Sequence, residues 1–481
     1  MTTALTTFVK KNLTYATALF FERGIAFLLL PLYTHALSPE EYGLYAVLFA
    51  FMAFAAFFSG LGVENGLLRY SSDSGMESSL TGTVFWAMSV SGLCLSASIF
   101  ALAGPISTRL LQDVRYRHLI QLSAGILLTD TAIRYFLYRL LGLQKTRLYL
   151  RISLLRGGTA MITNLIFVVL LRRGLNGVFL SYLSSNVLVI LFIFPFATGR
   201  VPLRFDAALF YKLFRFGFPV MLTSLLITLL NFFDRYLLEI RISAEAAGLY
   251  SAAYRIGFVM NMIVTAFSMG AVPFASHVLK EDPEERLVFS KLMQALFFVC
   301  VPVFLFLGLF IHDLVQFKVL GYAVINERYW KAMDIVPFIL LGYVFYGFSV
   351  NFSLGLYIRE KTSTMAVITL VAFGINVAAN CLLIPVYAAW GAAAATFLAF
   401  FVMAALMFGV SRRVFTVPYP WGRLIGLLTL ALALFVLSAF VVRLSWPVKL
   451  LSFLMFAGLQ TRLLFRDVFA DMLTRIRGGT A

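Results

Sequence analysis

Continuous apolar segments of spanning length recur along almost the whole chain and constrain its fold more than any other feature. A membrane-spanning helix needs about 20 such residues. Transmembrane β-strands instead alternate over about ten residues, so a β-barrel is excluded. The sequence predicts an all-α polytopic membrane protein with about 14 transmembrane helices, at residues 14–36, 43–64, 81–103, 119–141, 150–171, 175–197, 214–238, 247–272, 290–311, 332–357, 364–385, 389–410, 422–442 and 447–465.

Charged residues are scarce, which excludes several classes of protein. Hydrophobic residues make up 61% of the 481 residues and charged residues 13%, with a mean hydropathy of +0.91. Soluble proteins carry about 25% charged residues, so neither a soluble enzyme nor a large extramembrane catalytic domain is expected. The net charge of +17 comes without a basic stretch in a sizeable soluble region. No nucleic-acid partner is therefore predicted.

The distribution of Lys and Arg predicts which side of the membrane each loop faces. With the amino terminus inside, cytoplasmic segments hold about twice as many of these residues as the opposite side. Both termini are therefore expected in the cytoplasm. Two outer loops break this bias and are predicted to contain amphipathic helices at the membrane surface. Their basic residues are Arg109, Arg115 and Arg117 in one loop and Lys318, Arg328 and Lys331 in the other.

An internal repeat divides the chain. Residues 38–45 (SPEEYGLY) match residues 243–250 (SAEAAGLY), and residues 144–146 and 164 match 360–362 and 380 at nearly the same offset. Each copy holds six spans, so both insert in the same orientation and are related by an axis along the membrane normal. The sequence predicts a six-helix lobe over 1–200, a second over 201–411, and two further helices with a cytoplasmic tail over 412–481. A pathway between the lobes is expected.

The opening of the chain resembles that of a known family. Residues 23–34 (RGIAFLLLPLYT) and 37–43 (LSPEEYG) are similar to the opening signature of Wzx-type oligosaccharide flippases. Residues 329–332 (YWKA), 336–337 (VP) and 359–362 (REKT) resemble the tenth-span region of the same family. This family is the polysaccharide-biosynthesis branch of the multidrug/oligosaccharidyl-lipid/polysaccharide exporter superfamily. The resemblance covers essentially the whole chain and is more specific for the family than for the substrate.

The resemblance implies a function that composition and spacing do not reveal. It implies a multi-pass protein of the bacterial inner membrane that moves an undecaprenyl-(pyro)phosphate-linked oligosaccharide from the cytoplasmic to the outer leaflet by alternating access. The substrate would be a lipid-linked oligosaccharide, a precursor of O-antigen, lipopolysaccharide or exopolysaccharide. The implied partners are membrane lipids and the polysaccharide polymerase machinery.

Charged side chains inside the predicted spans are the candidate site residues. A charge at the bilayer centre costs about 2.5–3.5 kcal/mol on insertion scales, so such residues normally face an internal cavity. Arginine binds phosphate oxygens bidentately and stays ionised in a partly dry site. We therefore expect a mostly cationic cavity that binds the substrate phosphate, lined by Arg23, Arg134, Arg156, Arg235 and Arg255.

Three carboxylates occur in the same spans. Glu22, Asp130 and Asp234 are candidates for coupling transport to protons or sodium, because an acid in a low-dielectric site exchanges protons near neutral pH. The simpler alternative is that they only form ion pairs with the arginines. Asp130 and Arg134, four residues apart on one predicted helix, would neutralise each other in that case.

Enzyme motifs are missing from the sequence. It contains no G-x-x-x-x-G-K-[ST], G-x-S-x-G or H-E-x-x-H, and its four histidines and three cysteines are scattered. No catalytic residue, metal site or cofactor is predicted, apart from the coupling ion.

Two other functions remain as alternatives. A cation-coupled multidrug exporter of the same superfamily would have a cavity dominated by carboxylates and usually twelve spans. A polyprenyl-dependent glycosyltransferase or ligase would need catalytic groups on a sizeable outer loop, whereas the predicted outer loops are short.

Overall fold

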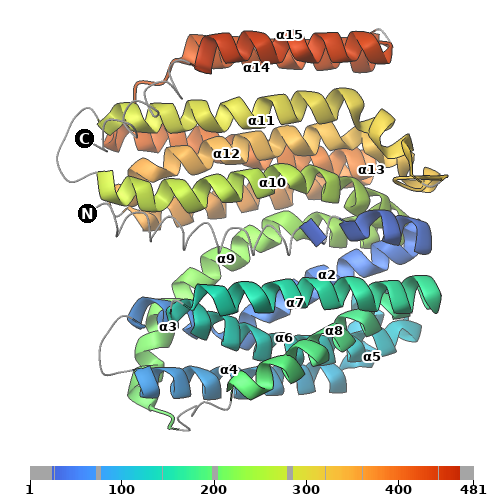
Figure 1. Ribbon diagram of the computed structural model, residues 1–481, viewed down its shortest axis with the longest axis vertical. Coiled ribbons are helices and arrows are strands. Elements are labelled where there is room, and N and C mark those ends of the chain that lie inside the picture. The colour runs from blue at the N-terminus through green and yellow to red at the C-terminus, as the bar shows by residue number, and fades with distance from the viewer. Residues whose placement is uncertain are drawn as a thin grey trace. The chain divides into compact units, whose positions relative to one another are not determined.

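The computed structural model describes residues 24–25, 28–71, 77–143, 145–197, 204–278, 285–319, 321–359, 361–441 and 444–465. Almost all of this described chain is helical (Figure 1). Within it, nine helices are long and apolar enough to cross a membrane, and one of these is a pair of predicted spans joined in a single element. The predicted all-α polytopic fold class is confirmed. About half of the first predicted span, 14–36, lies outside the described residues, and its residues 28–36 are helical.

The chain separates into two compact units, and the boundary between them in the sequence falls between Ala252 and Ala253. In the first unit, α6 packs against α2, α3, α4, α7 and α8, so it lies at the core. Its long helices are α2 (Pro39–Gly60), α4 (Glu77–Ala101), α6 (Arg117–Gly142), α7 (Thr146–Asn164) with its π-helical extension η2 (Leu165–Leu170), α8 (Gly174–Ala197) and α9 (Ala207–Arg241). Shorter elements are α3 (Val63–Tyr70), α5 (Ala103–Leu110) and the 3-10 turn η1 (Val114–Tyr116).

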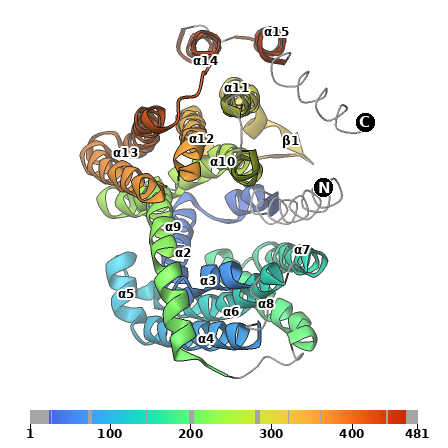
Figure 2. The same cartoon turned by 90° about the vertical axis from the view of Figure 1, so that its left-hand side faces the viewer.

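The second unit is built around α11, which packs against α12, α14 and α15 (Figures 1 and 2). Its helices are α10 (Ala244–Val278), which begins in the first unit, α11 (Glu285–Gln316), α12 (Val336–Ile358), α13 (Thr362–Val414), α14 (Trp421–Val436) with the π-helical η4 (Leu437–Val441), and α15 (Trp446–Phe465). The second predicted amphipathic loop forms the antiparallel strands β1 (Lys318–Val319) and β2 (Tyr322–Ala323) and the 3-10 helix η3 (Glu327–Ile335).

The boundary between the compact units differs from that between the predicted lobes. α9 packs against α2, α3 and α4, so it belongs to the first unit although its sequence belongs to the second copy of the repeat. Packing and sequence duplication are different criteria. The lobes over 1–200 and 201–411 and the segment 412–481 therefore stay predictions.

The two repeated motifs begin helices in the same way. The Ser38 hydroxyl accepts a hydrogen bond from the Glu41 amide at 3.1 Å, and the Ser243 hydroxyl accepts one from the Ala246 amide at 3.1 Å. Each serine satisfies an amide that the helix leaves unpaired in its first turn. In α2 the Glu41 carboxylate also accepts from the Ser38 amide at 3.0 Å, which completes a capping box.

A glycine contact fixes the break between α2 and α3. Gly62 has a φ of +78°, in the left-handed region that favours glycine. A Cβ atom on Gly217 of α9 would lie 2.0 Å from the Gly62 carbonyl oxygen, and one on Gly62 would lie 2.5 Å from the Gly217 carbonyl oxygen. The backbones of the break and of α9 therefore touch directly. This contact sets the position at which α3 leaves the end of α2.

The long element α13 consists of two legs. Ala388 interrupts it with φ 46° and ψ −122°, three residues after Pro385. A Cβ atom on Gly391 would lie 2.4 Å from the carbonyl oxygen of Leu383, so the chain turns back on itself within a few residues. The break falls between the predicted spans 364–385 and 389–410. Those two spans are the two legs of α13.

Candidate functional site

An ion pair joins α6 to α7 inside the first unit. An Nη2 atom of Arg156 donates a hydrogen bond to Oδ1 of Asp130. The Arg156 side chain is 29% exposed and that of Asp130 21%, so neither is fully enclosed. Ionised groups among apolar helices are stable when they are paired in this way. The structure thus brings together two of the residues selected from sequence.

Arg134 lies one helical turn beyond Asp130 and contacts different groups. Its Nη2 atom donates to the carbonyl oxygen of Ala56, in the last turns of α2, at 2.9 Å. The same atom lies 4.0 Å from Oε1 of Glu64. Asp130 is paired across the helix interface instead of along its own helix. The neutralisation between residues i and i+4 considered from sequence is therefore not the arrangement in the structure.

Glu64, the carboxylate beside Arg134, was not among the candidate residues selected from sequence. It stands in the first turn of α3, and its side chain is 8% exposed. A Cβ atom on Gly60 would lie 2.5 Å from Oε1, so Gly60 leaves the space that the carboxylate occupies. Glu64 ends the apolar segment 43–64, where a carboxylate is expected to reach the membrane surface. The two glycines just before it are the signal of a helix break that turns it inward.

Hydroxyl groups connect the helices around this charged cluster, which consists of Glu64, Asp130, Arg134 and Arg156. Thr131 donates to the Ser59 hydroxyl at 3.0 Å, and Ser91 donates to the Ser59 carbonyl oxygen at 2.6 Å. Thr159 and Ser185 lie 2.8 Å apart between α7 and α8. Such bonds stabilise helix pairs in membranes. They hold α2, α4, α6, α7 and α8 in place around the charged cluster.

Asp234 and Arg235 form a second, more enclosed arrangement. Asp234 accepts a hydrogen bond from Tyr250, a residue of the second repeated motif. Arg235 lies 3.6 Å from Asp234, donates to the carbonyl oxygen of Asn231, and stacks over Phe232 at 4.6 Å. The Asp234 side chain is completely buried and that of Arg235 is 7% exposed. These contacts tie α9 to the start of α10, and they enclose Arg235 more than Arg134 or Arg156.

The other predicted site residues lie outside the described part of the first unit. Glu22 and Arg23 lie outside the described residues, and Arg255 lies half-buried on α10 in the second unit. A carboxylate lies within 4.0 Å of each of Arg134, Arg156 and Arg235. Each of these three arginines therefore has a carboxylate beside it, and the mostly cationic cavity stays a prediction.

Outside the spans, an ion pair also orders the first predicted outer loop. Arg115 donates to both carboxylate oxygens of Asp113, through its amide at 2.8 Å and its Nε at 2.7 Å. These bonds hold the pKa of Asp113 below its ordinary value. Unlike the charged cluster, this pair lies in a loop, where the Arg115 side chain is 85% exposed.

Comparison with known proteins identifies the family. Residues 8–279, more than half of the chain, match the family described as "Polysaccharide biosynthesis protein". The chain belongs to this family. Residues 219–382 also match the family described as MatE. The resemblance to Wzx-type flippases within the wider exporter superfamily is thereby confirmed.

One curated relative of this family member has a transport role in its name. The "Succinoglycan biosynthesis transport protein ExoT" of Rhizobium meliloti (strain 1021) is 26% identical over 269 residues, covering 55% of this chain and 52% of ExoT. The match thus spans about half the length of that relative.

Solved structures show the same fold at low sequence identity. "Lipid II flippase MurJ, inward closed conformation" aligns with a TM-score of 0.72 and 16% identity, covering 94% of this chain and 99% of MurJ. An inward-facing multidrug resistance transporter of the MATE family aligns with a TM-score of 0.65 and 17% identity, covering 81% of this chain and 94% of that one. These structures show that this polysaccharide biosynthesis protein has the fold of multi-pass membrane transporters.

Proposed function

We propose that this family member is a flippase for an undecaprenyl-(pyro)phosphate-linked oligosaccharide. It would move its substrate from the cytoplasmic to the outer leaflet of the bacterial inner membrane by alternating access, with both termini in the cytoplasm. The observation that carries the proposal is the position of Arg134 and Arg156, two partly exposed guanidinium groups on adjacent helices within an apolar bundle. The family match and the transport role in the name of ExoT support it.

The contacts of Arg134 suit a group that changes partners. Its nearest carboxylate atom is 4.0 Å away, which is too long for a good hydrogen bond. In the described chain, Nε of Arg134 and Oε2 of Glu64 are both buried without a hydrogen-bond partner. Buried polar atoms are normally satisfied. We expect a substrate phosphate to take the place of Glu64 beside Arg134, because a guanidinium binds phosphate oxygens in a bidentate geometry.

The paired carboxylates have a role in this scheme. They balance the arginines when no substrate is bound, so that no uncompensated cation remains among apolar helices. Protonation of Asp130 would weaken its pairing with Arg156 and make the guanidinium available to phosphate. Coupling to protons or sodium through Asp130, Glu22 or Asp234 is therefore part of the proposal, as is delivery of the flipped glycan to polymerase machinery.

The direct test replaces the arginines in cells that lack the native gene. Arg134→Gln and Arg156→Gln should each reduce surface glycan about tenfold, because each removes charge-assisted hydrogen bonds to phosphate. Arg115→Gln is the matched control, since Arg115 forms an ion pair on an exposed loop. It should leave export unchanged. Full export by both cluster variants at normal protein levels would reject the phosphate-binding role.

The second candidate function is cation-coupled multidrug export. The match of residues 219–382 to the MatE family favours it. Drug accumulation in cells with and without the gene distinguishes the two functions. Efflux of cationic drugs, with no change in surface glycan when the gene is deleted, would support the exporter and exclude the flippase.

A further inference from the structure

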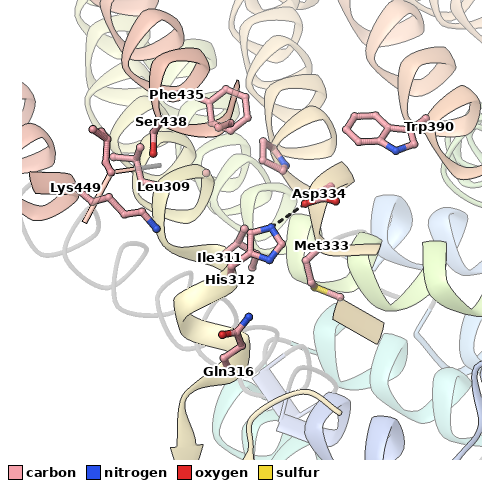
Figure 3. A pocket seen from close by; sticks show the side chains of 14 residues that line it. Leu309, Ile311, His312, Gln316, Met333, Asp334, Trp390, Phe435, Ser438 and Lys449 are labelled. Atoms are coloured by element: carbon pink, nitrogen blue, oxygen red, sulfur yellow. Dashed lines mark hydrogen bonds and ion pairs between the residues drawn. The ribbon is translucent and has the colours of Figure 1, made fainter. Parts of the chain in front are cut away.

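A cavity of about 680 Å³ opens in the second unit, among seven of its elements. Volumes of about 300–1,000 Å³ are typical of small-molecule sites. Figure 3 shows polar side chains from α11, η3, η4 and α15 around it, with Trp390 of α13 at one side. The polar residues that line it are His312, Gln316, Asp334, Ser438 and Lys449. A smaller cavity of about 180 Å³ in the same unit is lined almost wholly by Phe, Leu, Ala and other apolar residues. The polar lining is therefore specific to the larger cavity.

The charges of this cavity are already neutralised. His312 Nε2 lies 2.8 Å from Oδ1 of Asp334, and Lys449 donates to Oδ2 of Asp313 at 2.7 Å. The two adjacent residues at the end of α11 thus hold η3 on one side and α15 on the other. No uncompensated cation faces the cavity among its described lining residues. A phosphate group would have to break one of these pairs to bind.

The uncharged groups of the cavity are available to a ligand. Neither the Gln316 amide nor the Ser438 hydroxyl has a hydrogen-bond partner within the described chain. Trp390 is 41% exposed and packs against Phe338 with its ring centroid 5.2 Å away. An amide and a hydroxyl each both donate and accept hydrogen bonds. A ligand that matches them offers many hydroxyl groups and an apolar face that contacts an aromatic ring, which are the properties of a carbohydrate.

We infer that this cavity binds the sugar portion of a glycan. The inference rests on the proposed function, because a flippase must release a glycan on the outer side. In the predicted topology α11 runs outward from the cytoplasm, so the end that carries His312 and Gln316 faces the outer side. The cavity is separate from the charged cluster of the first unit, which would bind the phosphate. It also gives the helices after residue 411 a role, since η4 and α15 form part of its wall.

The test is a binding measurement on the purified full-length protein in detergent. The probe is the oligosaccharide released by mild acid from the lipid-linked repeat unit of the host and then dephosphorylated, with inorganic phosphate as competitor. Gln316→Leu should weaken binding about three- to tenfold through the loss of hydrogen bonds. Trp390→Leu should weaken it about tenfold through the loss of aromatic contact area. Trp86→Leu is the matched control, because Trp86 is similarly exposed, at 38%, on α4 of the first unit.

The binding measurement can either support or overturn the assignment of this cavity to the sugar. Weaker binding by both cavity variants, unchanged binding by Trp86→Leu and no competition by phosphate support the inference. No binding by the wild-type protein, equal binding by all variants, or displacement of the oligosaccharide by phosphate overturns it. The proposed function is decided separately, because it fails only if deletion of the gene leaves surface glycan unchanged.

Discussion

Gly43 and Gly248 contact each other backbone to backbone, near the starts of α2 and α10. A Cβ atom on Gly43 would lie 1.8 Å from the carbonyl oxygen of Ala244, and one on Gly248 would lie 1.7 Å from that of Pro39. Gly43 and Gly248 are equivalent positions of the two repeated motifs, and so are Pro39 and Ala244. The contact is therefore reciprocal, like an isologous interface between two copies of one protein. Residues without a side chain are required at both positions.

Gly43→Ala should lower the stability of the protein. The neighbouring atom is a backbone oxygen, which cannot move without displacing α10, so we expect a loss of about 1–3 kcal/mol, as for overpacking in a core. Thermal unfolding of the purified protein measures it. Gly158→Ala in α7 is the control, because nothing lies within 4 Å of its added methyl group. That variant should be neutral or slightly stabilised, since alanine favours helix more than glycine does. Equal midpoints for both variants would contradict the close contact.

The pairing of Asp130 with Arg156 predicts non-additive mutations. Arg156→Gln or Asp130→Asn alone leaves one charge without its partner and should cost about 1–2 kcal/mol, which is less than for a fully buried pair because both side chains are partly exposed. The double variant removes both charges and should be more stable than the sum of the single effects predicts. A double-mutant cycle by thermal unfolding measures this coupling. Additive losses would show that the two groups do not interact.

Two tyrosines allow a charged and a neutral hydrogen bond to be compared. Tyr250→Phe removes the hydroxyl that donates to the buried Asp234 carboxylate and should cost about 1–3 kcal/mol. Tyr33→Phe removes a donor to the Asn164 side-chain oxygen at 2.7 Å and should cost only about 0.5–1.5 kcal/mol. The midpoints of thermal unfolding at neutral pH, measured for both variants, show which of the two substitutions costs more stability. A larger loss for Tyr33→Phe would mean that Asp234 carries little charge in the folded protein.

The exposed pair Asp113 and Arg115 predicts a dependence of stability on pH. Arg115 lowers the pKa of Asp113 in the folded chain, so the folded protein binds a proton at this carboxyl less readily than the unfolded chain does. The stabilisation is therefore full above the ordinary pKa of about 4 and is lost as the pH falls through the lower folded value. The difference in melting temperature between wild type and Asp113→Asn, scanned from pH 7 to pH 3, should shrink towards zero at the acid end. A constant difference would argue against this pair.

The helices were predictable because their signals are local. The continuous apolar runs predict the spans, although the helices extend past them: α9 covers Ala207–Arg241 and α10 Ala244–Val278, where 214–238 and 247–272 were predicted. The two legs of α13 were separated correctly, because the apolar run pauses near Pro385. Each of these features depends on neighbours in the sequence and needs no knowledge of tertiary contacts.

The partners of the charged residues could not be predicted in this way. Asp130 has Arg134 four residues away, but it binds Arg156 of the next helix, because the packing of α6 against α7 decides which guanidinium is nearest. Glu64 was overlooked, because its inward direction depends on the backbone at Gly60 and Gly62. The carboxylate beside Arg134 likewise became visible only once the helices were assembled, whereas Asp234 beside Arg235 was already a candidate from the sequence. The charge balance of the site is therefore a property of the tertiary structure.

The turn at Ala388 determines where reporters of membrane sidedness can be inserted. Its two helical legs reverse direction between Leu383 and Gly391, leaving no hydrophilic stretch to carry an epitope or a protease site. An insertion there would force the legs apart. The hairpin between β1 and β2 is better suited, because Gly321 at its tip has open space around its α-carbon. A tag at that hairpin would report the orientation of the second unit without disturbing its helices.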